Sequence, residues 1–231
     1  MTFFKTYQVV LCVAVIAALG SSAPAALTLY GATPYLSSAN SPFTGSGLDY
    51  FYLEDFEDGL LNTPGVTVDN GYWTRSHYGS SLIDSVDADD GLIDGFGNNG
   101  NSWFGSNGAT GLTFTFNAVT LGALPTQAGI VWTDGANPIT VSFYDSTHAF
   151  VGSISTTGIA DGNYLGGTAE DRFFGISYDG GIRYMTITSG SGVGIEVDHL
   201  QYGGTVPAPG AILLCGLGAG LVSWMRRRGT L

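Results

Sequence analysis

The chain has 231 residues, with 19 acidic residues against 7 lysines and arginines and a formal net charge of −12. That length allows one ordinary domain with terminal segments, and the negative charge argues against nucleic acid as a partner, because it repels phosphate backbones. All acidic residues lie in the middle of the chain, whose only lysines or arginines are Arg75, Arg172 and Arg183. Both cysteines, Cys12 and Cys215, lie in apolar terminal runs, which excludes a disulfide within that middle part.

Residues 1–25 have the three parts of a secretory signal peptide. An apolar run over residues 9–19 follows Lys5, and the small-x-small tripeptide at residues 23–25 fits a cleavage site. The alternative is a first strand or helix of the fold itself. We expect export, with a mature chain that starts near Leu27.

Residues 26–205 are predicted to form one all-β domain. Short runs alternate apolar and polar residues, as in "LTFTF" at 112–116 and "ITVSFY" at 139–144, and glycine, aspartate and asparagine separate them. We count seven to nine such strands and no long segment with helical spacing. This pattern predicts an antiparallel β-sandwich that is jelly-roll-like.

The C-terminal segment, residues 206–231, is predicted to contain a helix that spans a membrane. The apolar run 211–225 would extend over about 22 Å as a helix, and about 28 Å if it begins at Pro207. A hydrocarbon core is about 30 Å thick, and arginines prefer its cytoplasmic side. The alternative is a buried element of a soluble fold. The expectation is an inner-membrane anchor with the acidic domain outside.

The order of parts in this segment resembles the PEP-CTERM sorting signal of exported proteins from Gram-negative bacteria that make extracellular polysaccharide. The residues that carry the resemblance are Val206, Pro207, Ala208 and Pro209, followed by the apolar helix and then by Arg226, Arg227 and Arg228. Ala208 stands where the family usually has glutamate. The resemblance implies an exosortase-type membrane enzyme as a partner, and a final location at the cell surface or outside the cell. The stretches "LEDFEDGLLNTPGV" and "GIEVDHLQYG" are similar to β-sandwich domains that often precede such a tail.

Two groups of carboxylates are candidate calcium ligands. The first is a dense acidic stretch, which comprises Asp84, Asp87, Asp89, Asp90 and Asp94. Like charges this close repel one another, and Ca²⁺ accepts six to eight oxygen ligands in flexible geometry. The spacing does not fit a helical calcium loop, and a solvated acidic turn is the alternative.

The second group joins the two ends of the predicted domain. Because the first and last strands of jelly rolls commonly lie side by side, Glu54 or Asp55 can meet Asp198 around one ion. The resemblance implies a structural calcium held in this way, as in many carbohydrate-binding jelly rolls. Polar strand faces in water are the alternative.

Aromatic residues near the predicted turns are candidate glycan platforms, because exposed aromatic faces stack on sugar rings. They are Tyr72, Trp73, Tyr78, Trp103, Phe104 and Trp132, and we take Trp73, Trp103 and Trp132 as the binding residues. The alternative is that these side chains belong to the core of the sandwich.

The sequence contains no nucleophile elbow, zinc-protease helix or phosphate loop, and its three histidines lie far apart. We therefore predict no enzymatic activity. The expected function is an exported, surface-sorted structural protein of the cell envelope or polysaccharide matrix, stabilised by calcium. One alternative is a carbohydrate-binding module for exopolysaccharide, and a second is a glycan hydrolase that uses two of the carboxylates.

Overall fold

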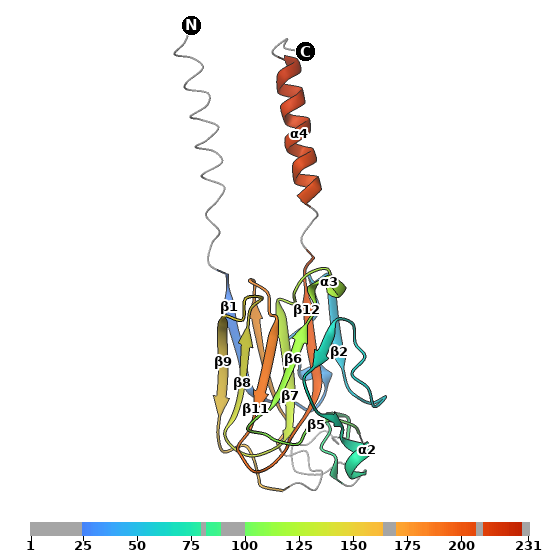
Figure 1. The fold of residues 1–231 in the computed structure, drawn as a ribbon, viewed down its shortest axis with the longest axis vertical. Coiled ribbons are helices and arrows are strands. Elements are labelled where there is room, and N and C mark those ends of the chain that lie inside the picture. The colour runs from blue at the N-terminus through green and yellow to red at the C-terminus, as the bar shows by residue number, and fades with distance from the viewer. Residues whose placement is uncertain (1–24, 80–81, 89–99, 164–169, 207–209, 228–231) are drawn as a thin grey trace.

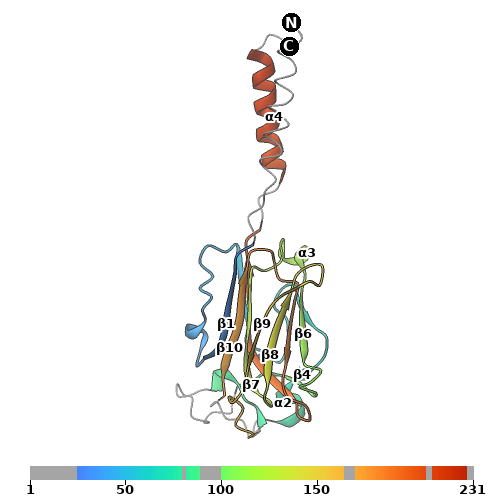
Figure 2. The same cartoon turned by 90° about the vertical axis from the view of Figure 1, so that its left-hand side faces the viewer.

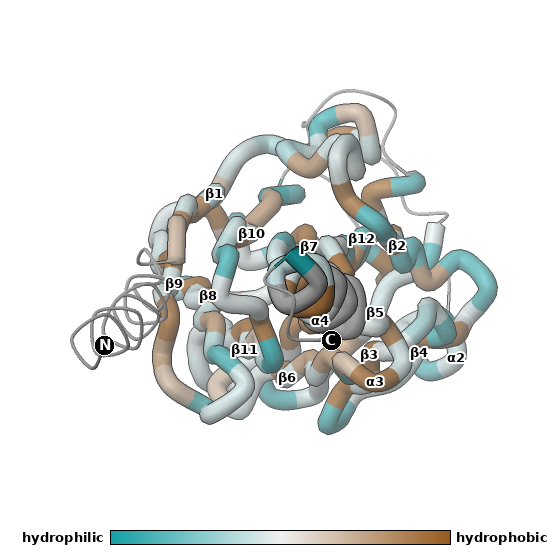
Figure 3. Tube along the Cα trace, turned by 90° about the horizontal axis from the view of Figure 1, so that it is seen from above, coloured by the Kyte–Doolittle hydropathy of each residue, from teal (hydrophilic) through white to brown (hydrophobic). Residues whose placement is uncertain are grey.

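The computed structural model describes residues 25–79, 82–88, 100–163, 170–206 and 210–227. It confirms the prediction of an all-β fold in which antiparallel strands form two packed sheets (Figure 1). Figure 3 looks along the sandwich, with β1, β10, β7 and β12 on one side and β9, β8, β11 and β6 on the other.

The larger sheet, here called sheet A, has seven strands, and all its pairings are antiparallel. In spatial order they are β1 (Leu27–Pro34), β10 (Arg172–Tyr178), β7 (Gln127–Asp134), β12 (Ile195–Gly204), β5 (Trp103–Gly105) and β4 (Tyr72–Trp73). The seventh strand, β2 (Tyr50–Glu54), also pairs with β12. The predicted pairing of "LEDFED" with the last strand of the domain is therefore confirmed for the strand that leads into it.

The smaller sheet, here called sheet B, has five strands. In spatial order they are β3 (Val66–Val68), β6 (Leu112–Phe116), β11 (Tyr184–Thr188), β8 (Ile139–Tyr144) and β9 (Phe150–Thr156). In β6 and β8 the buried residues alternate with more exposed ones over the whole strand. Sheet B therefore packs one face on the core, as the period-two pattern predicts.

The main core lies between the sheets and contains Phe114, Phe116 and Phe143 from sheet B and Ile130 and Trp132 from sheet A. Since the Trp132 indole is completely buried there, it cannot form part of an exposed glycan platform. That part of the aromatic prediction is wrong, because the sandwich needs its largest side chains inside.

A second apolar cluster covers the outer face of sheet A. It consists of Tyr35, Phe43, Val86, Val131 and Phe173. Figure 2 shows the segment after β1 lying over this face, including the short 3-10 helix η1 (Ser38–Asn40). As a result every residue of β12 is buried, because both faces of its sheet are covered.

The remaining helices are short except for the last. They are α2 (Thr74–Tyr78), the 3-10 helix η3 (Val86–Ala88), α3 (Ala118–Leu121) and α4 (Gly210–Arg227). The prediction of a helix after residue 210 is confirmed by α4. Within the described residues, however, no helix has the length and apolarity needed to cross a membrane, which does not support the predicted membrane span.

Candidate functional site

Acidic residues from three neighbouring strands of sheet A meet at one end of the sandwich. Glu196 of β12 lies directly opposite Asp134 of β7. Strand β10 lies on the other side of β7, and its first residue, Arg172, is opposite Trp132 of β7. Asp171 and Glu170 precede Arg172 in the chain, so they lie at the same end of the sheet as Asp134. Figure 1 shows this end, with β5 and α2, opposite the end from which α4 follows.

Asp84 joins these residues from the segment that crosses the outer face of sheet A. We call the five residues Asp84, Asp134, Glu170, Asp171 and Glu196 the carboxylate cluster. Asp84, Glu170, Asp171 and Glu196 are each at most 4% exposed. The charged groups that act on the Asp84 carboxyl are the other four members of the cluster.

Burial, and then repulsion between carboxylates, raise the pKa values of Asp84, Asp134, Glu170 and Glu196. Burial, followed by the charge of Asp171, raises the pKa of Asp84 well above its usual value. Burial is also the first cause for Asp134, Glu170 and Glu196, whose pKa values are raised to about 6, about 9 and about 8. For these four carboxyls, burial therefore outweighs the hydrogen bonds that favour the ionised form.

Hydrogen bonds satisfy only part of this cluster. Glu196 Oε1 accepts from the backbone N–H of Asp84 at 2.9 Å and from the Ser102 hydroxyl. Glu170 accepts from the backbone N–H of Asp161 through Oε1. In contrast, the buried Asp84 Oδ1 and Glu170 Oε2 receive no hydrogen bond from any residue that the structure describes.

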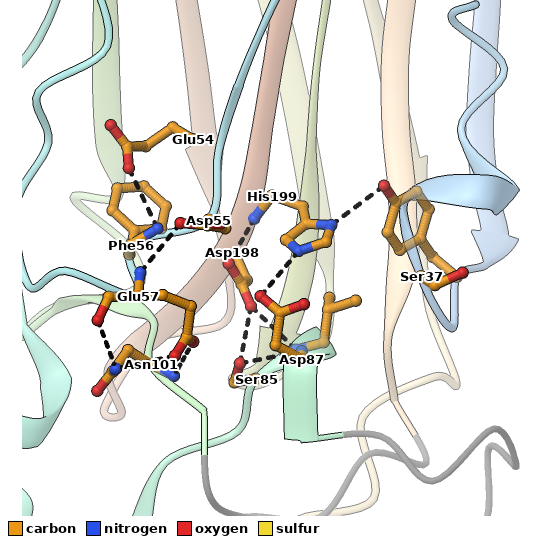
Figure 4. A network of polar contacts seen from close by, with 12 residues as sticks. Ser37, Glu54, Asp55, Phe56, Glu57, Ser85, Asp87, Asn101, Asp198 and His199 are labelled. Atoms are coloured by element: carbon orange, nitrogen blue, oxygen red, sulfur yellow. Dashed lines mark hydrogen bonds and ion pairs between the residues drawn. The ribbon is translucent and has the colours of Figure 1, made fainter.

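A second polar group, the outer network, is built around Asp198 and His199, which follow Glu196 in β12 and are labelled in Figure 4. It comprises Tyr35, Ser85, Asp87, Asp198 and His199. The His199 ring contacts Asp87 Oδ2 through Nε2 and the Tyr35 hydroxyl through Nδ1, each at 3.2 Å. Asp198 accepts from the Ser85 hydroxyl at 3.0 Å and from the backbone N–H groups of Val86 and His199 at 2.9 and 2.6 Å. Donors therefore surround Asp198 on both oxygens.

The backbone of β12 is distorted where it carries this network. His199 has a φ of 42°, in the left-handed region, and the register with β7 shifts between Asp198 and Gln201. A β-bulge of this kind redirects side chains, and strained non-glycine residues gather at functional sites. The bulge allows consecutive residues, Asp198 and His199, both to hydrogen-bond within the outer network.

Glu54 and Asp55 do not join Asp198 as shared ligands. Both Glu54 oxygens accept backbone N–H groups of the following turn, from Phe56, Asn62 and Thr63. Asp55 accepts from the backbone N–H of Glu57 at 3.1 Å. These carboxylates cap the turn after β2, which the sequence pattern does not distinguish from metal ligation.

A pocket of about 500 Å³ opens beside the carboxylate cluster. Its aromatic wall is formed by Tyr78 and Phe104, whose rings meet edge to face with centroids 5.1 Å apart. The polar lining comprises Asp134, Asn137, Asp161, Asn163 and Glu196. Gly194 makes room for this wall, because a Cβ there would lie 2.1 Å from the Phe104 ring.

The other two predicted tryptophans lie next to this pocket but do not line it. Trp73 and Trp103 face each other across β4 and β5 and are half-buried. Trp103 packs on Phe56 with centroids 5.7 Å apart and donates from Nε1 to the Asn70 carbonyl. Because successive residues of a strand point to opposite faces, Phe104 reaches the pocket where Trp103 does not.

The structure thus brings together three of the predicted metal ligands, Asp84, Asp87 and Asp198, at one end of the sandwich. Asp89, Asp90 and Asp94 lie outside the described residues, as do Pro207, Ala208, Pro209 and Arg228 of the sorting motif. Val206 is described, and its backbone N–H donates to Asp49 Oδ2 at 2.7 Å. Arg226 and Arg227 belong to the last turn of α4.

Sequence reasoning missed Asp134, Glu170 and Asp171. Each is a carboxylate at the end of a strand that reads as buried, in "IVWTDG" and "AEDRFFG". A carboxylate next to a buried strand is the feature of the sequence that could have identified these residues. Its meaning depends on which strands are neighbours, and local patterns do not reveal this.

Comparisons with known proteins give a structural likeness. No family model and no curated protein matches the chain. The structure of the CBM22-1 and GH10 modules of Clostridium thermocellum endo-1,4-beta-D-xylanase 10B, complexed with xylohexaose, matches with a TM-score of 0.36 and 14% sequence identity. The match covers 67% of this chain and 28% of that chain, so this chain spans under a third of its length.

Proposed function

We propose that this protein is an exported, non-catalytic, jelly-roll-like β-sandwich that binds a neutral glycan in the pocket beside the carboxylate cluster. The observation that carries the proposal is the composition of the pocket. Tyr78 and Phe104 form an aromatic wall, and carboxylates and amides line the rest. A sugar ring has apolar C–H faces and a rim of hydroxyl donors, so it needs both kinds of surface. The volume of about 500 Å³ also lies in the range of ordinary ligand sites.

The charge of the lining supports a neutral ligand. Asp134, Asp161 and Glu196 all border the pocket. A uronate or a sulfated sugar would be repelled by those of these carboxylates that are ionised, whereas the hydroxyls of a neutral sugar would donate to them. We therefore expect xylan, glucan or mannan to bind better than polygalacturonate.

The terminal segments supply the location in this proposal. Residues 1–25 direct export, and residues 206–231 act as the sorting signal that an exosortase-type enzyme recognises. A protein that binds polysaccharide outside the cell would meet its ligand by this route. Fractionation of host cells that produce the full chain, or a chain ending at residue 205, tests this step. Release of the shortened chain into the medium supports it, and equal distribution of the two chains contradicts it.

Glycan binding is tested by titrating the full-length protein with soluble xylan, glucan, mannan and polygalacturonate. The double variant Tyr78→Ala, Phe104→Ala removes the aromatic wall and should weaken binding of the preferred neutral glycan by about tenfold or more. Phe150→Ala is the matched control, because Phe150 is an exposed aromatic residue of β9 in the other sheet. Unchanged binding by the double variant, or equal losses in the control, would contradict the proposal.

A glycan hydrolase is the second candidate, and one observation favours it. Asp134 and Glu196 both line the pocket. Burial is the main cause that raises their pKa values, to about 6 and about 8. A raised pKa is what a carboxylic acid needs in order to protonate a leaving group near neutral pH. Incubation with the bound glycan and an assay for new reducing ends separates the two functions. We expect none, and release that disappears in Glu196→Gln would establish hydrolysis instead.

A further inference from the structure

We propose that the edge strand β9 is a docking surface for a second copy of this chain. In the dimer, β9 of one copy pairs antiparallel with β9 of the other about a two-fold axis, and the two copies of sheet B form one continuous sheet. The inference does not depend on glycan binding, because the pocket lies at the end of sheet A.

Strand β9 is a free edge without any feature that prevents pairing. Within the described parts of the chain it pairs only with β8, and it stands last in the order of sheet B. Its sequence, FVGSIST, has no charged residue and no proline. The register with β8 shifts between Phe150 and Gly152, and from Gly152 to Thr156 the pairing is regular. Such an edge offers unpaired backbone N–H and C=O groups to another strand.

The other edge strands among the described residues each carry a feature that blocks such pairing. β3 has three residues and β4 has two. β2 ends in Glu54 and leads directly into Asp55, so two copies of it would repel each other. β1 has a register irregularity between Tyr30 and Thr33 and ends in Pro34. Proteins blunt their sheet edges by these means, and β9 is therefore the edge that accepts a partner strand.

Packing against β1 holds β9 in place and puts apolar side chains beside its edge. The two strands are neighbours in Figure 3, and a Cβ on Gly31 of β1 would lie 2.5 Å from Ile154 Cγ2. Leu27 and Leu29 of β1 lie close to Gly152, since a Cβ there would be 3.9 and 3.4 Å from their Cδ2 atoms. These two leucines are 46% and 41% exposed. A strand added to β9 thus meets a preformed edge, and the second copy would cover both leucines.

Charge favours a second copy as the occupant of this edge. The chain has a formal net charge of −12, so two copies repel each other over most of their surfaces. At β9 they meet without any charge, and the outward residues of the adjacent strand β8, such as Thr140 and Ser142, are uncharged as well. This edge is therefore a place where two acidic copies can approach each other closely.

The sequence of β9 also complements itself. Residues that are directly opposite in an antiparallel pair point to the same face, so the exposed Ser153 and Ser155 would meet outward residues of the partner strand. Ile154 and Gly152 would meet inward ones. A two-fold contact uses the same surface on both copies and closes on itself. Because the other described edges are blocked, the assembly stops at a dimer.

The test measures the mass of the full-length protein against its concentration by analytical ultracentrifugation. The protein is kept in detergent micelles, because α4 exposes apolar side chains such as Leu217 and Leu221. We expect a reversible equilibrium between monomer and dimer. A parent protein that stays monomeric up to about 1 mM would overturn the proposal.

The double variant Ser153→Lys, Ser155→Lys locates the contact. It places like charges on the outward face of both paired strands, and we expect the Kd of the dimer to rise by at least about tenfold. Both serines are exposed, and a thermal melt verifies that the variant folds. Association equal to that of the parent would overturn the proposal, and this is the result that a contact through α4 would give.

A control variant carries the same change of charge elsewhere. Thr67→Lys, Thr110→Lys alters two exposed threonines, one in β3 at the opposite edge of sheet B and one in the turn before β6. This variant should dimerise as the parent does. A loss equal to that of the β9 variant would show that the added charge, and not its position, disrupts the dimer, and would overturn the assignment to β9.

Amide hydrogen exchange of the unmodified protein gives a second readout. When the concentration is raised through the Kd of the dimer, exchange over Phe150–Thr156 should slow several-fold, because the free edge amides gain partners. Exchange over Val66–Val68 of β3 should not change. Slowing at another edge, without any at β9, would overturn the proposal.

Discussion

The two sheets of this sandwich bury their residues in different ways. In β8 of sheet B, buried and half-buried residues alternate along the strand, whereas all ten residues of β12 in sheet A are buried. Sheet B has one face in water, whereas the central strands β7 and β12 of sheet A are covered on both faces, by the core and by the segments that include Tyr35 and Val86. The pocket and the carboxylate cluster both lie on sheet A, because the covering segments and loops bring polar groups to the ends of its strands. Sheet A, whose central strands are covered on the outer face as well, therefore carries the candidate site, whereas sheet B packs against the core from the other side.

The largest expected effect comes from truncating one side chain of the second apolar cluster. Phe173 lies on the outer face of sheet A, yet it is completely buried and stacks on Tyr35 with centroids 5.8 Å apart. Phe173→Ala should therefore cost about 3 to 5 kcal/mol of unfolding free energy, as much as a residue of the main core. Tyr144→Ala, on the open face of sheet B, should cost clearly less. Chemical denaturation measures both changes, and equal costs would mean that the faces of the two sheets do not differ in this way.

The next effect is the response of the stability of the protein to pH. Burial raises the pKa values of Asp134, Glu196 and Glu170 to about 6, 8 and 9 in the folded state, above those of an unfolded chain. The folded protein thus binds more protons than the unfolded chain, so stability is highest below the unfolded pKa of about 4 and is lost as pH rises through about 6 to 9. Burial also raises the pKa of Asp198 in the outer network, to about 7, against the lowering effect of His199.

The measurement is a series of thermal melts of the chelator-treated protein between pH 9 and pH 5.5. We expect the melting temperature to rise by several degrees on acidification, opposite to ordinary acid denaturation. A melting temperature that falls on acidification would show that these groups are already compensated in the folded state.

A smaller difference in unfolding free energy is expected between alanine substitutions at two glycines, one from each sheet. Gly129 of β7 lies under the second cluster, and a Cβ there would be 2.3 Å from Phe173 Cζ and 2.8 Å from the Phe174 carbonyl oxygen. At Gly152 of β9 the nearest atom would be Leu29 Cδ2, at an ordinary 3.4 Å. Gly129→Ala should therefore destabilise the protein by about 1 to 3 kcal/mol. Gly152→Ala should change the free energy of unfolding by less than about 0.5 kcal/mol, and a similar loss in both variants would contradict the difference.

The contrast between the sheets also explains what the sequence could predict. "LTFTF" and "ITVSFY" belong to sheet B, where one face meets water, so their alternation directly identifies strands and the buried face. "GIEVDHLQYG" contains β12, whose polar residues are buried by segments far away in the chain. Its Glu196 belongs to the carboxylate cluster and its Asp198 to the outer network, but a local pattern does not show which segments cover them. For the same reason the sequence did not show that Trp132 is buried in the core, or that Phe104 forms the aromatic wall of the pocket.

The smallest effect concerns two threonine hydroxyls. Thr133 of β7 is completely buried, and its Oγ1 has no hydrogen-bond partner among the residues described. Thr140 of β8 lies on the more open face of sheet B and contacts the Ser155 hydroxyl at 2.9 Å. Thr133→Val keeps the shape and removes a buried polar group, so we expect a gain of about 1 kcal/mol in unfolding free energy. Thr140→Val should change it by less than about 0.5 kcal/mol, because water reaches that pair. A loss of stability in Thr133→Val would mean that its hydroxyl has a partner.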